Sequence, residues 1–509
     1  MPETTTSETT APAQSTPPES KKPAGAKKSK WQLFPGFSPW LVLGVFATAV
    51  VIRLVLALLS QGQNSNVTSH TNPELPYAEL VEVAPGSSYF FTWGVTASPR
   101  TKEIARTSTD DRYGDTYSQS RQVLSTLQSD LSEVGLSLRD VVNVRAYIVG
   151  DDGEEPDFAA WNKAFMEFFG TWHNPHVPAR TTLGITRLFN PDYRVEVEFV
   201  VAFPDGRGPF DEGSWFDKRH QRLSRTETSE NWLSYGRPSW VMSTGKATAP
   251  GTDLFFSAQV RPAPLMPNAP PALQMFGTVD QQTASIFKEM SQTLQEAGLG
   301  YEDVFFVRTI VYPDPRTSIG HSFSSFNKTY GEFFNNDKNP NRPTRTLMSA
   351  PGLTGKKQYL SIEFYAAYPE AKEGDIRETV GEAGGLGTQG AVGGRGTRVS
   401  KDGRMLWLSG TIASTSAEEP LEAQLASALE GVERRLALAG ATKEDITAVR
   451  AYLVYDSNAI QMQQEITAWE KFFQENLGEV NPAVTTLPVV SLPGGYRVEL
   501  EVQAVIADE

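Results

Sequence analysis

Cysteine is absent from this sequence of 509 residues. Its absence excludes thiolate catalysis, disulfide bonds and metal sites built on cysteine. A chain without thiols suits an oxidising compartment, although many cytosolic proteins also lack cysteine. The length is that of about three or four domains.

An excess of positive charge is also missing. The formal net charge is −14 and the isoelectric point is near 5.1. An acidic protein repels phosphate backbones, so we expect no nucleic-acid partner.

The common catalytic motifs are missing as well, because the sequence contains no HExxH, Walker loop or G-x-S-x-G. The spacing of Gly385, Gly387 and Gly390 fits G-x-G-x-x-G, but no apolar strand precedes it and no helical pattern follows. His173 and His176 have an H-x-x-H spacing, which supplies two metal ligands at best. We therefore expect neither a cofactor nor a metal.

Long apolar runs are rare, with one exception from Trp40 to Leu59. Twenty helical residues span about 30 Å, which is the hydrocarbon thickness of a bilayer. Residues 1–38 form a polar tail that we expect to be disordered. Lysines precede the run, whereas residues 60–82 contain no lysine or arginine. The sequence thus predicts a transmembrane helix over 39–60, with the N-terminus in the cytoplasm and the remainder extracytoplasmic, or periplasmic in a Gram-negative bacterium.

Other interpretations of this run are weaker. A buried core helix rarely lacks polar positions over such a length, and no small-x-small cleavage site of a signal peptide follows. Arg53 interrupts the run about 9 Å from its end, within reach of the membrane interface. A functional role for Arg53 is the alternative.

A pattern of glycine, aspartate and arginine recurs three times after residue 72. In each copy the aspartate follows the glycine by five residues, and the arginine follows five residues later. The glycine is typical of a residue that ends a helix, and alternating apolar residues then predict a strand. The sets are Gly135, Asp140 and Arg145; Gly298, Asp303 and Arg308; and Gly440, Asp445 and Arg450.

The similarity extends over whole domains in the order β, α, β, α, β. Each copy starts with an apolar strand, has an aromatic-rich second helix and ends with a proline-containing loop and a strand. We expect domains over 73–205, 232–370 and 390–508. Linkers are expected over 61–72, 206–231 and 371–389. The paired aromatics Phe168/Phe169 and Phe333/Phe334 are interpreted as packing residues.

These residues resemble the Rid family of reactive-intermediate deaminases, also called YjgF/YER057c/UK114. The resemblance lies in the glycine–aspartate junction, the FF-containing helix, the P-x-R-T loop and the final V-E-V-E strand, and it covers nearly all of residues 73–508, once per copy. It implies an α+β fold of the chorismate-mutase type and trimers with ligand pockets between subunits. Three copies in one chain imply an intramolecular pseudo-trimer, preceded by one transmembrane helix.

The resemblance also implies site residues. An arginine of the P-x-R-T loop would bind the substrate carboxylate, which suits its planar fork. Arg180 and Arg345 match it, whereas Val484 replaces it in the third copy. A glutamate that positions the attacking water matches Glu196 and Glu499, but Ser361 stands in the second copy.

A pocket tyrosine near the start of the domain matches Tyr77. If the arginine comes from one copy and the tyrosine and glutamate from the next, Arg345 would meet Tyr77 and Glu196. Arg180 would then meet Glu499 without a tyrosine. Glu196 and Glu198 alternate on a strand, which leaves open that one of them faces solvent.

Two functions follow from these patterns. The first is hydrolysis of 2-imino or enamine acids to 2-oxo acids and ammonia at one surviving pocket between domains, with Arg180 or Arg345 as the carboxylate-binding residue and Glu196 as the water-orienting base. The second is a membrane-tethered binding or scaffolding platform without catalysis. Besides the membrane at 40–59, a small ligand with a carboxylate is the expected partner. The sequence does not identify a protein partner.

Overall fold

A computed structural model describes residues 64–100, 112–150, 154–204, 224–228, 232–236, 243, 245–270, 273–314, 316–351, 357–381, 395–455 and 458–507. Residues 63–509 form one compact unit. The run at 40–59, the polar tail and the glycines at 385–390 lie outside the described residues. Among the helices of the described residues, none has the length and apolarity needed to cross a membrane.

The first segment, residues 64–204, combines two helices with eight strands. Its elements are β1 (Val67–Thr71), β2 (Ala78–Val83), β3 (Tyr89–Thr92), β4 (Val95–Thr96), α3 (Thr116–Glu133), β5 (Val141–Val149), α4 (Phe158–Phe165), β6 (Ala179–Ile185), β7 (Arg187–Leu188) and β8 (Val195–Ala202). Two strands follow it, β9 (Ser224–Thr228) and β10 (Trp232–Gly236). The expected α+β fold is therefore confirmed.

The second segment, residues 245–381, has the same alternation. It contains β11 (Gly245–Thr248), β12 (Leu254–Ser257), α5 (Val279–Ala297), β13 (Val304–Val311), α6 (Ile319–Phe333), β14 (Thr344–Ser349), β15 (Leu360–Ala367) and β16 (Arg377–Val380). The third segment, residues 395–507, contains β17 (Gly396–Val399), β18 (Gly403–Leu408), β19 (Thr411–Ile412), α7 (Leu421–Ala437), β20 (Ile446–Val454), α8 (Ala459–Leu477), β21 (Ala483–Val489) and β22 (Val498–Ala507).

Three stretches expected to be linkers contain regular structure. Strand β1 lies within 61–72, β9 within 206–231 and β16 within 371–389. Each pairs with a neighbouring strand, β1 with β2, β9 with β10 and β16 with β17. Their polar, charged sequences concealed them because a strand at a sheet edge buries little apolar surface.

The recurring glycine and aspartate build the same turn three times. The glycines have φ values of 72°, 75° and 75°, in the left-handed region that other residues avoid. Each aspartate then closes a short helical turn by accepting a backbone N–H bond of 2.8 Å. The pairs are Ser137 with Asp140, Gly300 with Asp303 and Thr442 with Asp445. The expected ends of the three helices are confirmed.

One strand near the start of each segment joins the sheet of another segment. Strand β2 pairs with β18, β11 with β3, and β17 with β12, all antiparallel. The exchange is cyclic, because each segment both lends one strand and receives one. A 15-stranded sheet and a 7-stranded sheet result.

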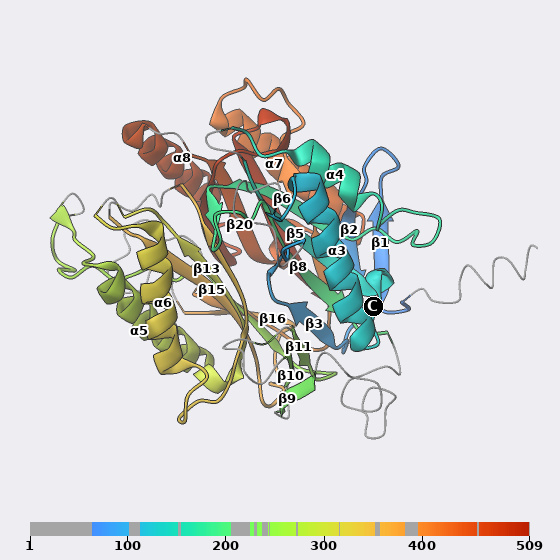
Figure 1. The fold of residues 1–509 in the computed structure, drawn as a ribbon, viewed down its shortest axis with the longest axis horizontal. Coiled ribbons are helices and arrows are strands. Elements are labelled where there is room, and N and C mark those ends of the chain that lie inside the picture. The colour runs from blue at the N-terminus through green and yellow to red at the C-terminus, as the bar shows by residue number, and fades with distance from the viewer. Residues whose placement is uncertain are drawn as a thin grey trace, which may run out of the picture. The chain divides into compact units, whose positions relative to one another are not determined.

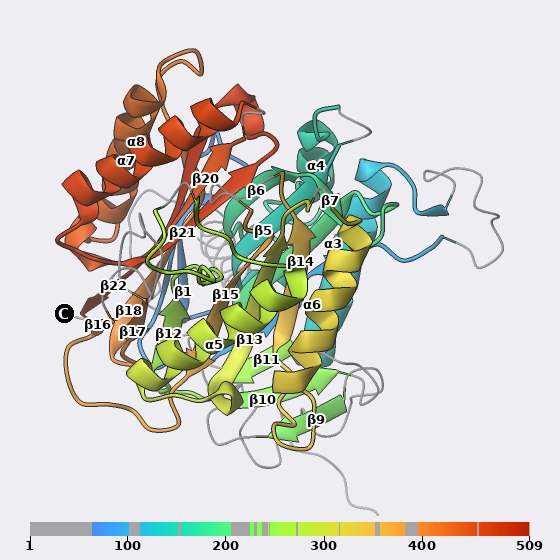
Figure 2. The same cartoon turned by 90° about the vertical axis from the view of Figure 1, so that its left-hand side faces the viewer.

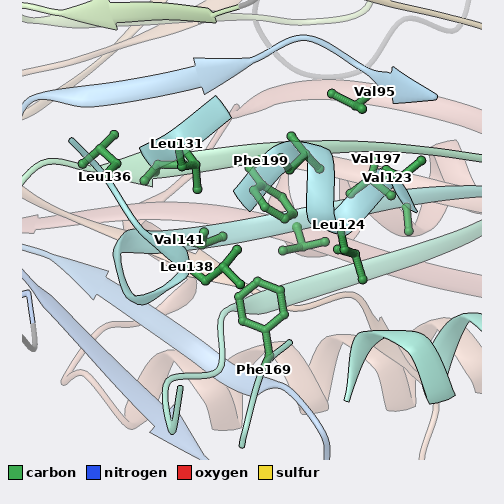
Figure 3. Packing of buried hydrophobic residues seen from close by; sticks show 14 of the residues in the cluster. Val95, Val123, Leu124, Leu131, Leu136, Leu138, Val141, Phe169, Val197 and Phe199 are labelled. Atoms are coloured by element: carbon green, nitrogen blue, oxygen red, sulfur yellow. The ribbon is translucent and has the colours of Figure 1, made fainter. Parts of the chain in front are cut away.

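Helix pairs cover the sheets. Figure 1 shows α3 with α4, α5 with α6, and α7 with α8 outside the strands, and Figure 2 shows α5 and α6 side by side over β13. The helices bury apolar stripes against their own sheets, which gives three separate hydrophobic clusters. Figure 3 shows the first of them, in which Leu124 of α3 packs with Val141 and Phe199.

The faces of the strands turned away from the helices form a core shared by all three segments. One shared cluster is rich in aromatic residues and includes Phe91, Phe306 and Trp407. A second includes Tyr147, Ile310 and Tyr452. Along β13, Phe306 belongs to the first cluster and Ile310 to the second, and Arg308 stands between them on the same face.

Arg308 belongs to a closed ring of six buried charges. The ring alternates one arginine and one glutamate, and each segment supplies one of each: Arg145, Arg308 and Arg450 with Glu198, Glu363 and Glu501. Every arginine contacts two of the glutamates. The suggestion that Glu198 or Glu196 faces solvent is wrong, since both are buried. The recurring arginine of the sequence pattern thus lies in the shared core.

Candidate functional sites between the segments

Arg180 lies at the start of β6, where the first segment meets the third. Its N–H donates to Ser409 Oγ at 2.6 Å, and its carbonyl accepts from the N–H of Gly410 at 3.1 Å. The guanidinium lies over the ring of Tyr77, 4.5 Å from the centroid. Arg180 is only 8% exposed, and its Nη1 has no hydrogen-bond partner among the described residues. A buried cation with an unpaired donor is costly unless a ligand satisfies it.

Glu499 of β22 faces Arg180 across this junction. Burial, assisted by the nearby Glu501, raises the pKa of Glu499 to about 8, although Arg435 and Arg180 oppose the shift. Burial also lowers the pKa of Arg180 to about 10, so the arginine stays charged at neutral pH. The Arg180 site therefore joins a cation with a carboxyl group that is mostly protonated at pH 7.

Arg345 forms a matching site between the second segment and the first. Its carbonyl accepts from Gly94 N–H at 3.3 Å, and its guanidinium lies 4.8 Å from the ring centroid of Tyr330. Arg345 Nε has no partner within the described part of the chain. Burial raises the pKa of Glu196 to about 8, assisted by Glu198 and opposed by the Leu347 N–H and by Arg345.

Two of the expected combinations are present in the structure, and one is wrong. Arg345 lies with Glu196, and Arg180 with Glu499. Tyr77, however, stacks on Arg180 of its own segment, because β2 runs beside β6 and Ala78 pairs with Ala179. Tyr330 of α6 contacts Arg345 instead. Nothing in the sequence distinguished Tyr330 from the other aromatic residues of that helix.

The third junction has the same backbone contact but different side chains. The N–H of Gln259 donates to the carbonyl of Val484 at 2.9 Å, so Gln259 takes the place of Gly94 and Gly410. Its side chain donates to Ser361 Oγ at 2.9 Å and accepts from Arg261 at 2.8 Å. At this junction Gln259 stands in place of the glycine and Ser361 in place of the glutamate. The amide of Gln259 takes the place of the carboxyl group.

Glycine is required where the glutamates pack. A Cβ on Gly410 would overlap Oε1 of Glu499. We expect Gly410→Ala to lower the free energy of unfolding by about 1–3 kcal/mol, the usual cost of overpacking, in a denaturant titration. Gly331→Ala is the control, because this exposed helical glycine has open space around its Cβ position and should gain stability. Equal effects of both substitutions would contradict the tight packing of Glu499.

The two histidines of the H-x-x-H pattern lie in different surroundings. His176 Nε2 lies 2.6 Å from the carbonyl oxygen of Val141 and the residue is partly buried, whereas His173 is exposed. Within the described residues, no group of three or more histidine, aspartate or glutamate side chains is placed to hold a metal.

Comparisons with known proteins give the same class as the fold and its paired sites. The family model described as Endoribonuclease L-PSP matches residues 99–203 and again 394–506. A RutC family protein of Pyrococcus horikoshii is 30% identical over 126 residues, which cover 25% of this chain and 86% of that protein. A RutC family protein of Haemophilus influenzae is 26% identical over 127 residues, covering 25% of this chain and 86% of that protein.

The similarity extends to solved structures. A member of the YjgF/YER057c/UK114 family from Mycobacterium tuberculosis is 25% identical, with a TM-score of 0.16, covering 21% of this chain and 85% of that one. The protein described here is an α+β protein with a repeated domain of this type. It belongs to the Rid family, also named YjgF/YER057c/UK114 or RutC.

Proposed function

We propose that this protein hydrolyses 2-imino and enamine acids to 2-oxo acids and ammonia at the Arg180 and Arg345 sites. One observation carries the proposal. Each site combines a buried arginine, which has an unpaired N–H donor within the described residues, with a buried carboxyl group of raised pKa from another segment. Such perturbed groups cluster at functional sites.

The residues have separate roles in this reaction. The arginine binds the substrate carboxylate through charge-assisted hydrogen bonds. The protonated glutamate donates its proton to the imine nitrogen, which makes the imine carbon electrophilic. Water adds to that carbon, and the resulting carboxylate accepts a proton from the adding water. Loss of ammonia then leaves the 2-oxo acid. An imine hydrolyses readily, so orientation and proton transfer are sufficient.

Single substitutions test whether two sites are active. At saturating concentrations of freshly generated imino acids, Arg180→Ala and Arg345→Ala should each remove about half of the ammonia release by the full-length chain, since one site remains intact. Each substitution removes the charge-assisted hydrogen bonds between the arginine and the substrate carboxylate, which are strong when buried. Arg434→Ala, at an exposed arginine, should leave the rate unchanged. No acceleration over buffer by the folded wild-type chain would refute the deaminase proposal.

We further propose that the three segments are diverged copies of one Rid domain, packed as an intramolecular trimer. The repeated glycine turn, the cyclic strand exchange and the ring with one arginine and one glutamate from each segment support this arrangement. Covalent linkage replaces the association of separate subunits, since the neighbouring copy is always at high effective concentration.

The chain is also proposed to be anchored in a membrane through residues 40–59. The apolar run and the lysines before it support this anchor. In cell fractionation we expect the full-length chain in the membrane pellet after an alkaline carbonate wash, and a chain without residues 40–59 in the supernatant. Release of the intact chain by carbonate would contradict the anchor.

The filled third junction favours a second candidate, a non-catalytic platform. Gln259 occupies the space that carboxyl groups take in the other two junctions. A platform whose interfaces have lost chemistry one by one would show such replacements. The ammonia assay separates the two candidates, because a platform binds its ligand without turnover.

A further inference from the structure

The Arg180 site contains a second arginine, Arg435 of α7. Its Nη1 donates to the carbonyl oxygen of Ser409 at 2.8 Å and to Thr411 Oγ1 at 2.6 Å. Arg180 binds the same Ser409–Gly410 turn from the opposite segment, and the Glu499 carboxyl packs against Gly410. The Arg435 guanidinium, the Glu499 carboxyl group and the backbone of Arg180 thus meet at one turn. Arg435 Nε has no hydrogen-bond partner among the described residues.

Arg435 is not paired with a carboxylate of its own at close range. Glu79 lies 3.7 Å from Arg435 Nε and 3.9 Å from the exposed Arg434, so this one carboxylate faces two arginines. The Glu499 carboxyl is mostly protonated at pH 7, because its pKa is raised to about 8. The Arg180 site therefore carries more positive charge than one substrate carboxylate neutralises.

The Arg345 site differs at the corresponding position. Arg435 precedes the left-handed Gly440 by five residues, and at this spacing before Gly135 the first segment has Asp130. Tyr330, Phe326 and Leu347 surround Arg345 and Glu196, and all three are buried. An apolar site with one arginine favours a ligand with a single negative charge.

We propose that the Arg180 site binds a ligand with two carboxylates and that the Arg345 site binds a monocarboxylate. This division rests on the proposed function and adds the substrate class of each site. Arg180 would bind the carboxylate beside the reacting carbon, and Arg435 would attract the distal one. A second charge-assisted contact strengthens binding by roughly tenfold or more.

Calorimetric titration of the full-length chain with stable 2-oxo acids tests the division without turnover. In an Arg345→Ala background, only the Arg180 site remains. We expect 2-oxoglutarate to bind this variant at least about tenfold more tightly than 2-oxobutanoate. Adding Arg435→Gln should abolish that preference while leaving the affinity for 2-oxobutanoate within about twofold. Arg435→Lys should retain part of the preference, because it keeps the charge. Thermal unfolding of each variant checks its fold.

The control is Lys471→Gln, which removes one positive charge from the surface of the same segment at a side chain that is 73% exposed. It should keep the preference for 2-oxoglutarate. An equal loss of both affinities in Arg435→Gln would reveal a purely structural role and overturn the proposal. Equal affinities in the Arg345→Ala background, or no binding of either acid, would overturn it too. Preserved selectivity without ammonia release would refute the deaminase proposal alone.

Discussion

Replacing Glu363 by glutamine is expected to lower the free energy of unfolding by about 3–5 kcal/mol, the usual cost of breaking a buried ion pair. Glu363 accepts hydrogen bonds from Arg450 at 2.9 Å and from Arg308 at 3.0 Å, one from the third segment and one from its own. Glutamine has the same shape but no charge, so two buried arginines lose a counter-ion. Chemical denaturation of the full-length chain measures the change.

A surface pair provides the control. Lys471 and Glu475 are 3.7 Å apart and well exposed, so Glu475→Gln should change the stability by no more than about 0.5 kcal/mol. If Glu363→Gln were equally mild, the ring would contribute little, and its charges would have to be solvated in the folded protein.

The ring also sets the acid stability. Burial alone would raise the pKa of Glu501, but Arg145 and Arg450 lower it to about 2, and Arg450 and Arg308 likewise hold the pKa of Glu363 well below its usual range. A carboxylate with a depressed pKa stabilises the fold above its unfolded pKa of about 4.3. That contribution is lost as the pH falls toward 2. The contribution of the ring should therefore lower the melting temperature as the pH falls from about 4 to about 2. Above pH 5 the ring adds no further change, whereas the raised pKa values of Glu196 and Glu499 should lower the melting temperature as the pH rises toward 8.

The double variant Glu196→Gln with Glu499→Gln is expected to lower kcat/KM for imine hydrolysis by about 100-fold or more, the usual contribution of a general acid. Glutamine keeps the size of each side chain and the neutral charge of a protonated carboxyl, but it has no acidic proton. Each single variant should retain about half of the activity, because the other site is intact. Near-full activity in the double variant would exclude the proposed proton transfer.

The pH profile provides a second test of the same step. The pKa of both glutamates is raised to about 8, so their protonated forms dominate below this pH. Activity that requires the proton should be level below about pH 7 and should fall as the pH passes 8. A rise across this range would instead assign the glutamates the role of base.

Local features of this chain were predictable from the sequence. Gly135, Gly298 and Gly440 ended their helices because the left-handed conformation favours glycine and the following strands alternate in polarity. The pairing of Arg345 with Glu196 was expected only from the family resemblance, which implies an arginine from one copy and a glutamate from the next.

Long-range pairings could not be predicted from local sequence patterns. Tyr77 faces Arg180 because a single bridge sets β2 beside β6, and no local pattern encodes that register. Arg145, Arg308 and Arg450 were visible as a repeat, yet one of the two glutamate partners of each comes from another segment. The replacement of the loop arginine by Val484 and of the glutamate by Ser361 was visible as well. The filling of the junction by Gln259, however, depends on a contact between two segments.

The cyclic exchange of strands between segments has a consequence for folding during synthesis on the ribosome. Ser409 donates to the carbonyl of Ala78, which lies 331 residues earlier. Strand β2 can therefore pair with β1 early, but it can pair with β18 only after most of the chain has been made. Such distant contacts delay folding because the chain entropy is lost before the contacts form. An exposed strand edge invites pairing with other chains in the meantime. The exchange can therefore close only after residue 408 has been made, and a chain truncated before β18 would lack the strand that pairs with β2.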